Sequence, residues 1–135
     1  MQIHDICDVI FKLYLYSDVT KMIHYSTDSN HEHELADRVR DTILIFVDDL
    51  AEQTFGFFGK PSFSDMSIKQ DITIEKDLNK LCQKCIDTVL PLRTVFKEMD
   101  RLSGIVSLIE DFTAKLGQMA FLGTFDKVSN YKLPK

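Results

Sequence analysis

A single apolar stripe with helical spacing runs without a break through residues 31–58. Its side chains recur every three or four residues, which places them on one face of an α-helix. The members are Leu35, Val39, Ile43, Phe46, Leu50, Thr54 and Phe57. Ser29 with Glu32 makes a capping-box pattern before the stripe, and Gly59 and Pro61 follow it. The sequence therefore predicts one helix over residues 31–58, about 42 Å long at 1.5 Å per residue.

Three other stretches carry apolar residues with the same period, at residues 3–24, 74–99 and 105–119. Only five Gly and three Pro occur among the 135 residues, so we expect few tight turns and a few long elements. Pro91 lies inside the third stretch and predicts a kink or local break there. These features predict an all-α fold made of four helices.

The connections between the four stretches are short except for residues 59–70, which could hold a short helix near their end. Four helices with one longer connection between the second and third are typical of a four-helix bundle with a single crossover. We assign this bundle to residues 1–125. Residues 126–135 show no pattern and are interpreted as a C-terminal tail.

Charge and hydropathy exclude several classes of protein. The formal net charge is −5, which does not support DNA binding by a generally basic surface. The longest apolar run, Ile43 to Val47, is far too short to cross a membrane. The first residues lack the basic and apolar regions of a secretory signal, and the chain has three Cys. We therefore expect a cytoplasmic protein with reduced thiols.

The predicted second helix has a mixed face opposite its apolar stripe. With Val39 at zero, four potential metal ligands fall between about 120° and 220° on the helical wheel. They are His33, Asp37, Asp48 and Glu52. Leu44, Ala51 and Phe55 lie among them. A helix that is apolar on two sides, with metal-type ligands on the second side, is typical of burial against a partner.

Spacing limits what these ligands can do. Asp48 and Glu52 are one helical turn apart, so one ion can touch both carboxylates. His33 precedes Asp48 by about 22 Å along the axis, so one chain cannot place both on the same ion. Two copies could pack antiparallel about a two-fold axis near residues 40 and 41. This arrangement would bring His33 of one copy to Asp48 of the other. His24 could join them. Imidazole and carboxylate ligands with open positions suit iron(II).

Asp41 lies near this predicted two-fold axis and could face its own copy. Such a contact between like charges needs Arg38, Arg40 or an ion to offset it.

The segments His24-Tyr25, His33 to Asp37 and Asp48 to Glu52 resemble the ferroxidase segment of Dps-type miniferritins. The His33–Asp37, His33–Asp48 and Asp48–Glu52 spacings match that family, and the stretch from Ser107 to Leu122 resembles its last helix more weakly. Tyr25 stands where the family usually has Trp, and the loop between the first and second helices is shorter than usual. By this resemblance the chain is a divergent or reduced member.

This resemblance implies a ferritin-like bundle that assembles as a two-fold dimer, and as a dodecameric cage in the family. It also implies ferroxidase activity, in which Fe(II) is oxidised by peroxide or oxygen and stored as a ferric mineral. By resemblance, His24, His33 and Asp37 would come from one subunit. Asp48 and Glu52 would come from its two-fold mate.

A different class of function stays open: a helical bundle without metal that dimerises or docks a partner through residues 31–58. The chain contains no Glu-x-x-His motif, so an intrachain di-iron oxidase is disfavoured. Cys82 and Cys85 fall mid-helix near the apolar stripe and are interpreted as buried apolar residues. His31 is interpreted as a capping residue and His4 as a surface residue.

Overall fold

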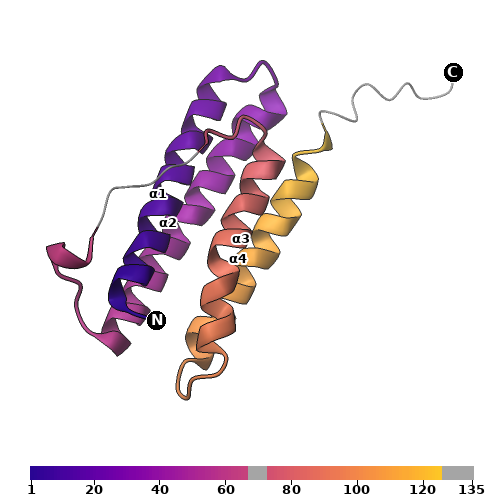
Figure 1. Ribbon diagram of the computed structural model, residues 1–135. Helices are drawn as coiled ribbons and strands as arrows, with labels where there is room; N and C mark the ends of the chain where they lie inside the picture. The colour runs from indigo at the N-terminus through magenta and orange to yellow at the C-terminus, as the bar shows by residue number, and fades with distance from the viewer. Residues whose placement is uncertain (67–72, 126–135) are drawn as a thin grey trace, which may run out of the picture.

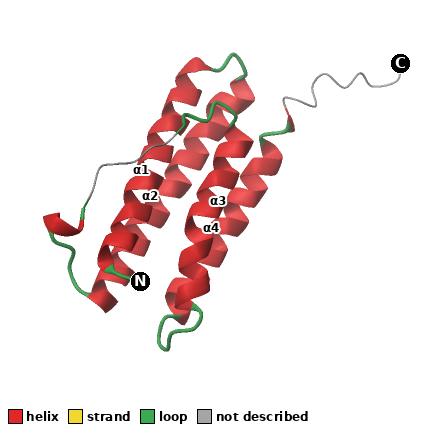
Figure 2. Ribbon diagram, viewed as in Figure 1, coloured by secondary structure: helices red, strands yellow, loops and turns green. Residues whose placement is uncertain are grey.

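The computed structural model describes residues 1–66 and 73–125. Four long helices make up most of this part of the chain, and no strand occurs in it (Figure 2). They are α1 (Ile3–Ser26), α2 (Asn30–Phe58), α3 (Leu78–Phe96) and α4 (Ser103–Leu122). One short 3-10 turn, η1, covers Phe63–Asp65. The predicted all-α bundle of four helices is confirmed, and the predicted tail at 126–135 lies outside the described residues.

The helices pack as two antiparallel pairs, α1 with α2 and α3 with α4, which lie side by side (Figure 1). Ile74 and Glu75, just before α3, share a pocket with Ile23 near the end of α1. At the opposite end of the bundle, the rings of Phe58 and Phe96 lie 5.8 Å apart at the ends of α2 and α3. Helices α2 and α3 therefore run in the same direction (Figure 1).

One apolar core fills the space between the four helices. Each helix contributes side chains that are fully buried, among them Leu13, Ile43, Leu81 and Ile109. The rings of Phe46 on α2 and Phe112 on α4 stack with centroids 3.8 Å apart. Burial of this many aliphatic and aromatic groups supplies the main driving force for folding. Among the described residues, no helix combines the length and apolar character needed to span a bilayer.

The ends of the helices follow local capping chemistry. The Ser29 side chain accepts a hydrogen bond from the Glu32 amide at 3.0 Å, which confirms the predicted start of α2. Asp77 caps α3 in the same way, so this helix begins at Leu78 and not at Ile74, whose side chain is exposed. The sequence predicts a kink or local break at Pro91, and the structure shows no break, because helix α3 continues through this residue. Pro91 is exposed, so water can reach the carbonyl group that its ring leaves unpaired.

The predicted apolar stripe of α2 differs from the structure at its last position. Phe57 was predicted to face the core, but its side chain is 46% exposed. Phe58 packs against the core in its place and lies beside Phe96. The reason is a tertiary contact, because the last turn of α2 packs against the end of α3. The buried position in this turn therefore lies one residue later than the stripe that faces α4 predicts.

Candidate metal centre

Two histidines meet where α1 ends and α2 begins. His24 Nδ1 donates a hydrogen bond to the backbone oxygen of His33 at 2.6 Å, and His33 Nδ1 donates to that of His24 at 2.7 Å. The two rings stack with centroids 3.6 Å apart and an angle of 19° between their planes. Because a carbonyl oxygen only accepts, each Nδ1 carries the hydrogen, and each Nε2 in a neutral ring keeps its lone pair.

This pattern of hydrogen bonds is the one that prepares imidazole for metal binding. Histidine ligands commonly donate their other ring N–H to a carbonyl or carboxylate, which fixes the tautomer and the ring orientation. The short loop between α1 and α2 holds His24 and His33 in this reciprocal arrangement, and the His24 side chain is only 13% exposed. The structure thus brings together two of the five predicted site residues, with the Nδ1 of each ring engaged by a backbone oxygen.

Asp37 joins the same group from the second turn of α2. Its Oδ1 lies 3.4 Å from His24 Nδ1 and 3.0 Å from Lys21 Nζ. The hydrogen bond from Lys21 lowers the pKa of the Asp37 carboxyl, with a smaller contribution from the neighbouring His24. Because Asp37 meets the Nδ1 side of the ring, its position suits an orienting carboxylate better than a direct ligand.

Asp48 and Glu52 form a second, acidic group farther along α2. Together with Asp49 they place one carboxylate oxygen each within 4.8 Å of one another. Among the described residues this is the one group of three His, Cys, Asp or Glu side chains close enough to share an ion. Sequence analysis passed over Asp49, although its three-residue spacing from Glu52 also places the two on neighbouring positions of a helix.

The two groups are separate in one chain. Asp37 and Asp48 are eleven residues apart on α2, which corresponds to about 16 Å along the helix. The histidine group offers nitrogen donors without a third ligand close by, whereas the acidic group offers carboxylates without an imidazole. Neither group alone supplies the mixed set of ligands that suits iron(II).

The apolar residues on the second face of α2 are partly accounted for within the chain itself. Ala51 and Phe55 pack against the chain's own core, and Leu44 is half-buried. These contacts remove part of the reason to expect a partner on this face, and burial against a partner stays a prediction. His33, Asp48 and Glu52 stay exposed on the same helix.

His31 does not cap α2, contrary to the prediction, because Ser29 performs that role. Its Nε2 lies 2.8 Å from the backbone oxygen of Leu122, at the end of α4. The ring also stacks on Phe125 at 6.2 Å between centroids. His31 thus links the start of α2 to the end of α4, and it could satisfy one of the carbonyl groups left free at that helix end.

The three cysteines are buried thiols, as the sequence predicts for Cys82 and Cys85. Burial raises the pKa of the Cys82 thiol to about 12 and that of Cys85 well above its usual value. Desolvation also raises the pKa of Cys7, with a smaller contribution from Asp65. Since the thiolate is the nucleophile and metal ligand, these residues are poor candidates for either role.

We expect these thiols to react slowly with Ellman's reagent at pH 8 in the native protein. At a pKa of about 12, only about one Cys82 side chain in 10,000 is ionised at that pH. In guanidinium chloride all three thiols should react rapidly, because unfolding removes the burial that raises their pKa. Fast labelling of all three in the native protein would contradict the buried placement.

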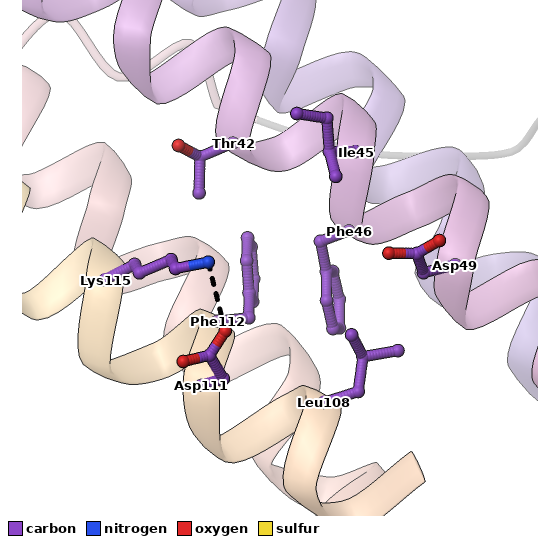
Figure 3. Close-up of a pocket in the computed structure, with 8 residues that line it drawn as sticks. All are labelled: Thr42, Ile45, Phe46, Asp49, Leu108, Asp111, Phe112 and Lys115. Carbon is purple, nitrogen blue, oxygen red and sulfur yellow. Dashed lines mark ion pairs between the residues drawn. The ribbon is translucent and has the colours of Figure 1, made fainter. Parts of the chain in front are cut away.

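A surface cleft of about 140 Å³ lies between α2 and α4 (Figure 3). The stacked rings of Phe46 and Phe112 lie between the helices there, and Lys115 pairs with Asp111 at 3.0 Å beside them. Pockets that hold drug-sized molecules are commonly several hundred Å³. This cleft is therefore too small for a nucleotide or a comparable cofactor.

A larger, mostly apolar pocket of about 540 Å³ lies between α1 and the segment before α3. Its lining includes Met22, Ile23 and Ile74, with Asp18, Glu75 and Lys76 supplying charge. None of the five predicted metal-site residues lines it. Among the described residues, no His or Cys side chain lines it.

Comparison of the chain with models of known families, with curated proteins and with solved structures finds no match.

Proposed function

We propose that this protein is a Dps-like, ferritin-like bundle that takes up Fe(II) as its substrate and oxidises it at sites shared by two subunits. His24 and His33 of one subunit would bind iron through Nε2, with Asp37 orienting His24. Asp48 and Glu52 of the other subunit would complete each site. Peroxide or oxygen would accept the electrons, and assembly of dimers into a cage would give storage of the ferric product.

The observation that carries this proposal is the reciprocal pair of hydrogen bonds between His24 and His33. It leaves two imidazole nitrogens free as donors at a place where the sequence predicts two iron ligands. Carboxylates are the complementary ligand type, and Asp48 and Glu52 lie exposed on the same helix. An antiparallel pair of α2 helices would bring the two groups together twice, once on each side of the two-fold axis.

The order of the helices also supports the proposal. Helices α2 and α3 run in the same direction (Figure 1). This direction is the one that a single long crossover between them would require. A single crossover of this kind distinguishes ferritin-like bundles from up-and-down bundles, in which all three connections are short. The resemblance noted in the sequence thus agrees with the direction of all four helices.

A second candidate function is a helical module that docks a partner without metal. It is favoured by the outer side of α1, where Tyr14, Leu15, Met22 and Tyr25 expose large apolar groups. An apolar surface of this kind fits an interaction site. The two candidates differ in one respect that can be measured, because only the first requires iron chemistry.

Replacing Asp48 by Asn and Glu52 by Gln together is expected to slow Fe(II) oxidation by at least about tenfold, because both carboxylates of each site are lost. Stopped-flow absorbance after mixing anaerobic Fe(II) with peroxide measures the rate. Glu98→Gln with Asp100→Asn is the matched control, since it removes the same two charges from an exposed turn. Equal rates for the wild type and the Asp48/Glu52 variant would refute the iron site and leave the docking module.

A further inference from the structure

The pocket between α1 and the segment before α3 has the size of a small-molecule site. Its volume of about 540 Å³ lies within the range that is common for such sites. One wall is the last part of α1, with Val19, Met22 and Ile23, and the other wall includes Ile74. Helix α1 ends and helix α3 begins at the same end of the bundle (Figure 1). Two segments that are distant in the sequence therefore form this pocket.

Contacts with α3 hold the second wall in place. Glu75 Oε2 lies 3.2 Å from Lys84 Nζ on α3, and Glu75 Oε1 accepts a hydrogen bond from the Asp77 N–H at 3.1 Å. This hydrogen bond lowers the pKa of the Glu75 carboxyl, and Lys84 lowers it further, so Glu75 is charged at pH 7. Asp77 also caps the start of α3. Both walls are thus supported by the chain itself, without a ligand.

The inside of the pocket presents apolar groups to solvent. Val19 and Ile23 are buried against the core and give it an apolar floor. Met22 and Ile74 line the same pocket, yet they are 62% and 69% exposed. Covering such groups is favourable by about 25 cal/mol for each Å² removed from water. The flexible Met22 side chain can also adapt to the shape of an apolar ligand.

The charges around the pocket indicate which head group such a ligand carries. Asp18 lies one helical turn before Met22, is exposed, and takes part in no ion pair among residues 1–66 and 73–125. Glu75 already has Lys84 as its cation. Lys76 is the ammonium group of the lining. Its long, strongly hydrated side chain loses more conformational freedom on binding than the short Asp18 side chain, which a regular helix positions.

We propose that this pocket binds a small amphipathic cation, with an apolar body between Met22 and Ile74 and a protonated amine that pairs with Asp18. The net charge of −5 also favours the approach of a cation. None of the five proposed iron-site residues lines the pocket. The inference therefore does not depend on the proposed function.

Isothermal titration calorimetry of the full chain with n-octylamine, which is protonated at pH 7, tests this assignment. Octanoate is the matched probe, since it has a similar apolar chain and the opposite charge. We expect one octylamine site, and octanoate should bind at least about tenfold more weakly. Asp18→Asn should weaken octylamine binding by at least about tenfold, because it removes the charge that pairs with the amine. Asp100→Asn, on an exposed turn, is the control and should bind like the wild type.

Ile74→Asn tests the apolar part of the site separately. It should weaken the binding of octylamine severalfold, because it removes apolar surface from one wall. Ile74 is exposed and lies outside the helices, so the variant should fold, which circular dichroism checks.

Three results would overturn the proposal: no saturable binding of octylamine, octanoate binding as tight as that of octylamine, or an Asp18→Asn variant that binds like the wild type. Tighter binding of octanoate that is lost in Lys76→Gln would assign the pocket to anions instead. The variant with Asp48→Asn and Glu52→Gln should bind octylamine like the wild type. Failure of the iron site and failure of this pocket are therefore measured separately.

Discussion

Mixing two inactive variants is expected to restore about a quarter of the wild-type rate of Fe(II) oxidation. The first variant carries His33→Gln and the second carries Asp48→Asn with Glu52→Gln. After random reassociation, half of the dimers contain one subunit of each kind. In such a dimer one site loses all three altered ligands, while the other site combines the intact His33 of one subunit with the intact Asp48 and Glu52 of its mate.

The experiment uses the two proteins unfolded together in urea, refolded and assayed by stopped-flow absorbance. Each variant refolded alone is the control and should stay inactive. Circular dichroism must show that both are helical. If activity appears in the refolded mixture and in neither variant by itself, each active site takes ligands from two chains. Inactivity of the mixture, despite mixed dimers detected by mass spectrometry, would contradict the shared site.

Replacing Ile43 by Ala is expected to lower the free energy of unfolding by about 2 to 5 kcal/mol, because it leaves a cavity in the centre of the bundle. Ile43 is fully buried between the helices. Ile45→Ala is the matched control on the same helix, since the Ile45 side chain is 66% exposed. That change should stay within about 0.5 kcal/mol. Urea unfolding followed by circular dichroism measures both.

The contrast between the two isoleucines tests how the chain places α2. If Ile45→Ala lowers the free energy of unfolding as much as Ile43→Ala does, then Ile45 is buried in solution. Its exposed position beside the cleft would then be wrong. The measurement should be made over a range of protein concentrations. If the loss of unfolding free energy caused by Ile45→Ala grows with protein concentration, a second copy of the chain buries Ile45.

Much of the site could be predicted from the sequence because it depends on position along one helix. The four-residue step from Asp48 to Glu52 places both carboxylates together in any α-helix, and the structure has them in one group. The separation of His33 from Asp48 also follows directly from the helical rise. Asp49 lies outside the family spacing, although it is within one helical turn of Glu52 and so joins the same group.

Other features could not be predicted because they depend on contacts between elements. The reciprocal bonds between His24 and His33 require the loop between α1 and α2 to bring two backbone oxygens to two rings. The contact of His31 with Leu122 joins residues 91 positions apart, which no local pattern encodes. Phe58 replaces Phe57 in the core for the same reason, because the end of α3 determines which side of the last turn is buried.

The sequence by itself determined that this chain forms four helices, where α2 begins, and which carboxylates lie within one turn of each other. These features follow from hydrogen bonds and side-chain spacing within a helix, which involve neighbours in the chain. Only the tertiary structure decided that His24 and His33 each bond to the other's backbone oxygen. It also decided that the Arg40 Nε is buried without an acceptor in the described part of the chain. Both depend on how separate helices pack, because burial and hydrogen-bond partners are properties of the assembled core and not of any single segment.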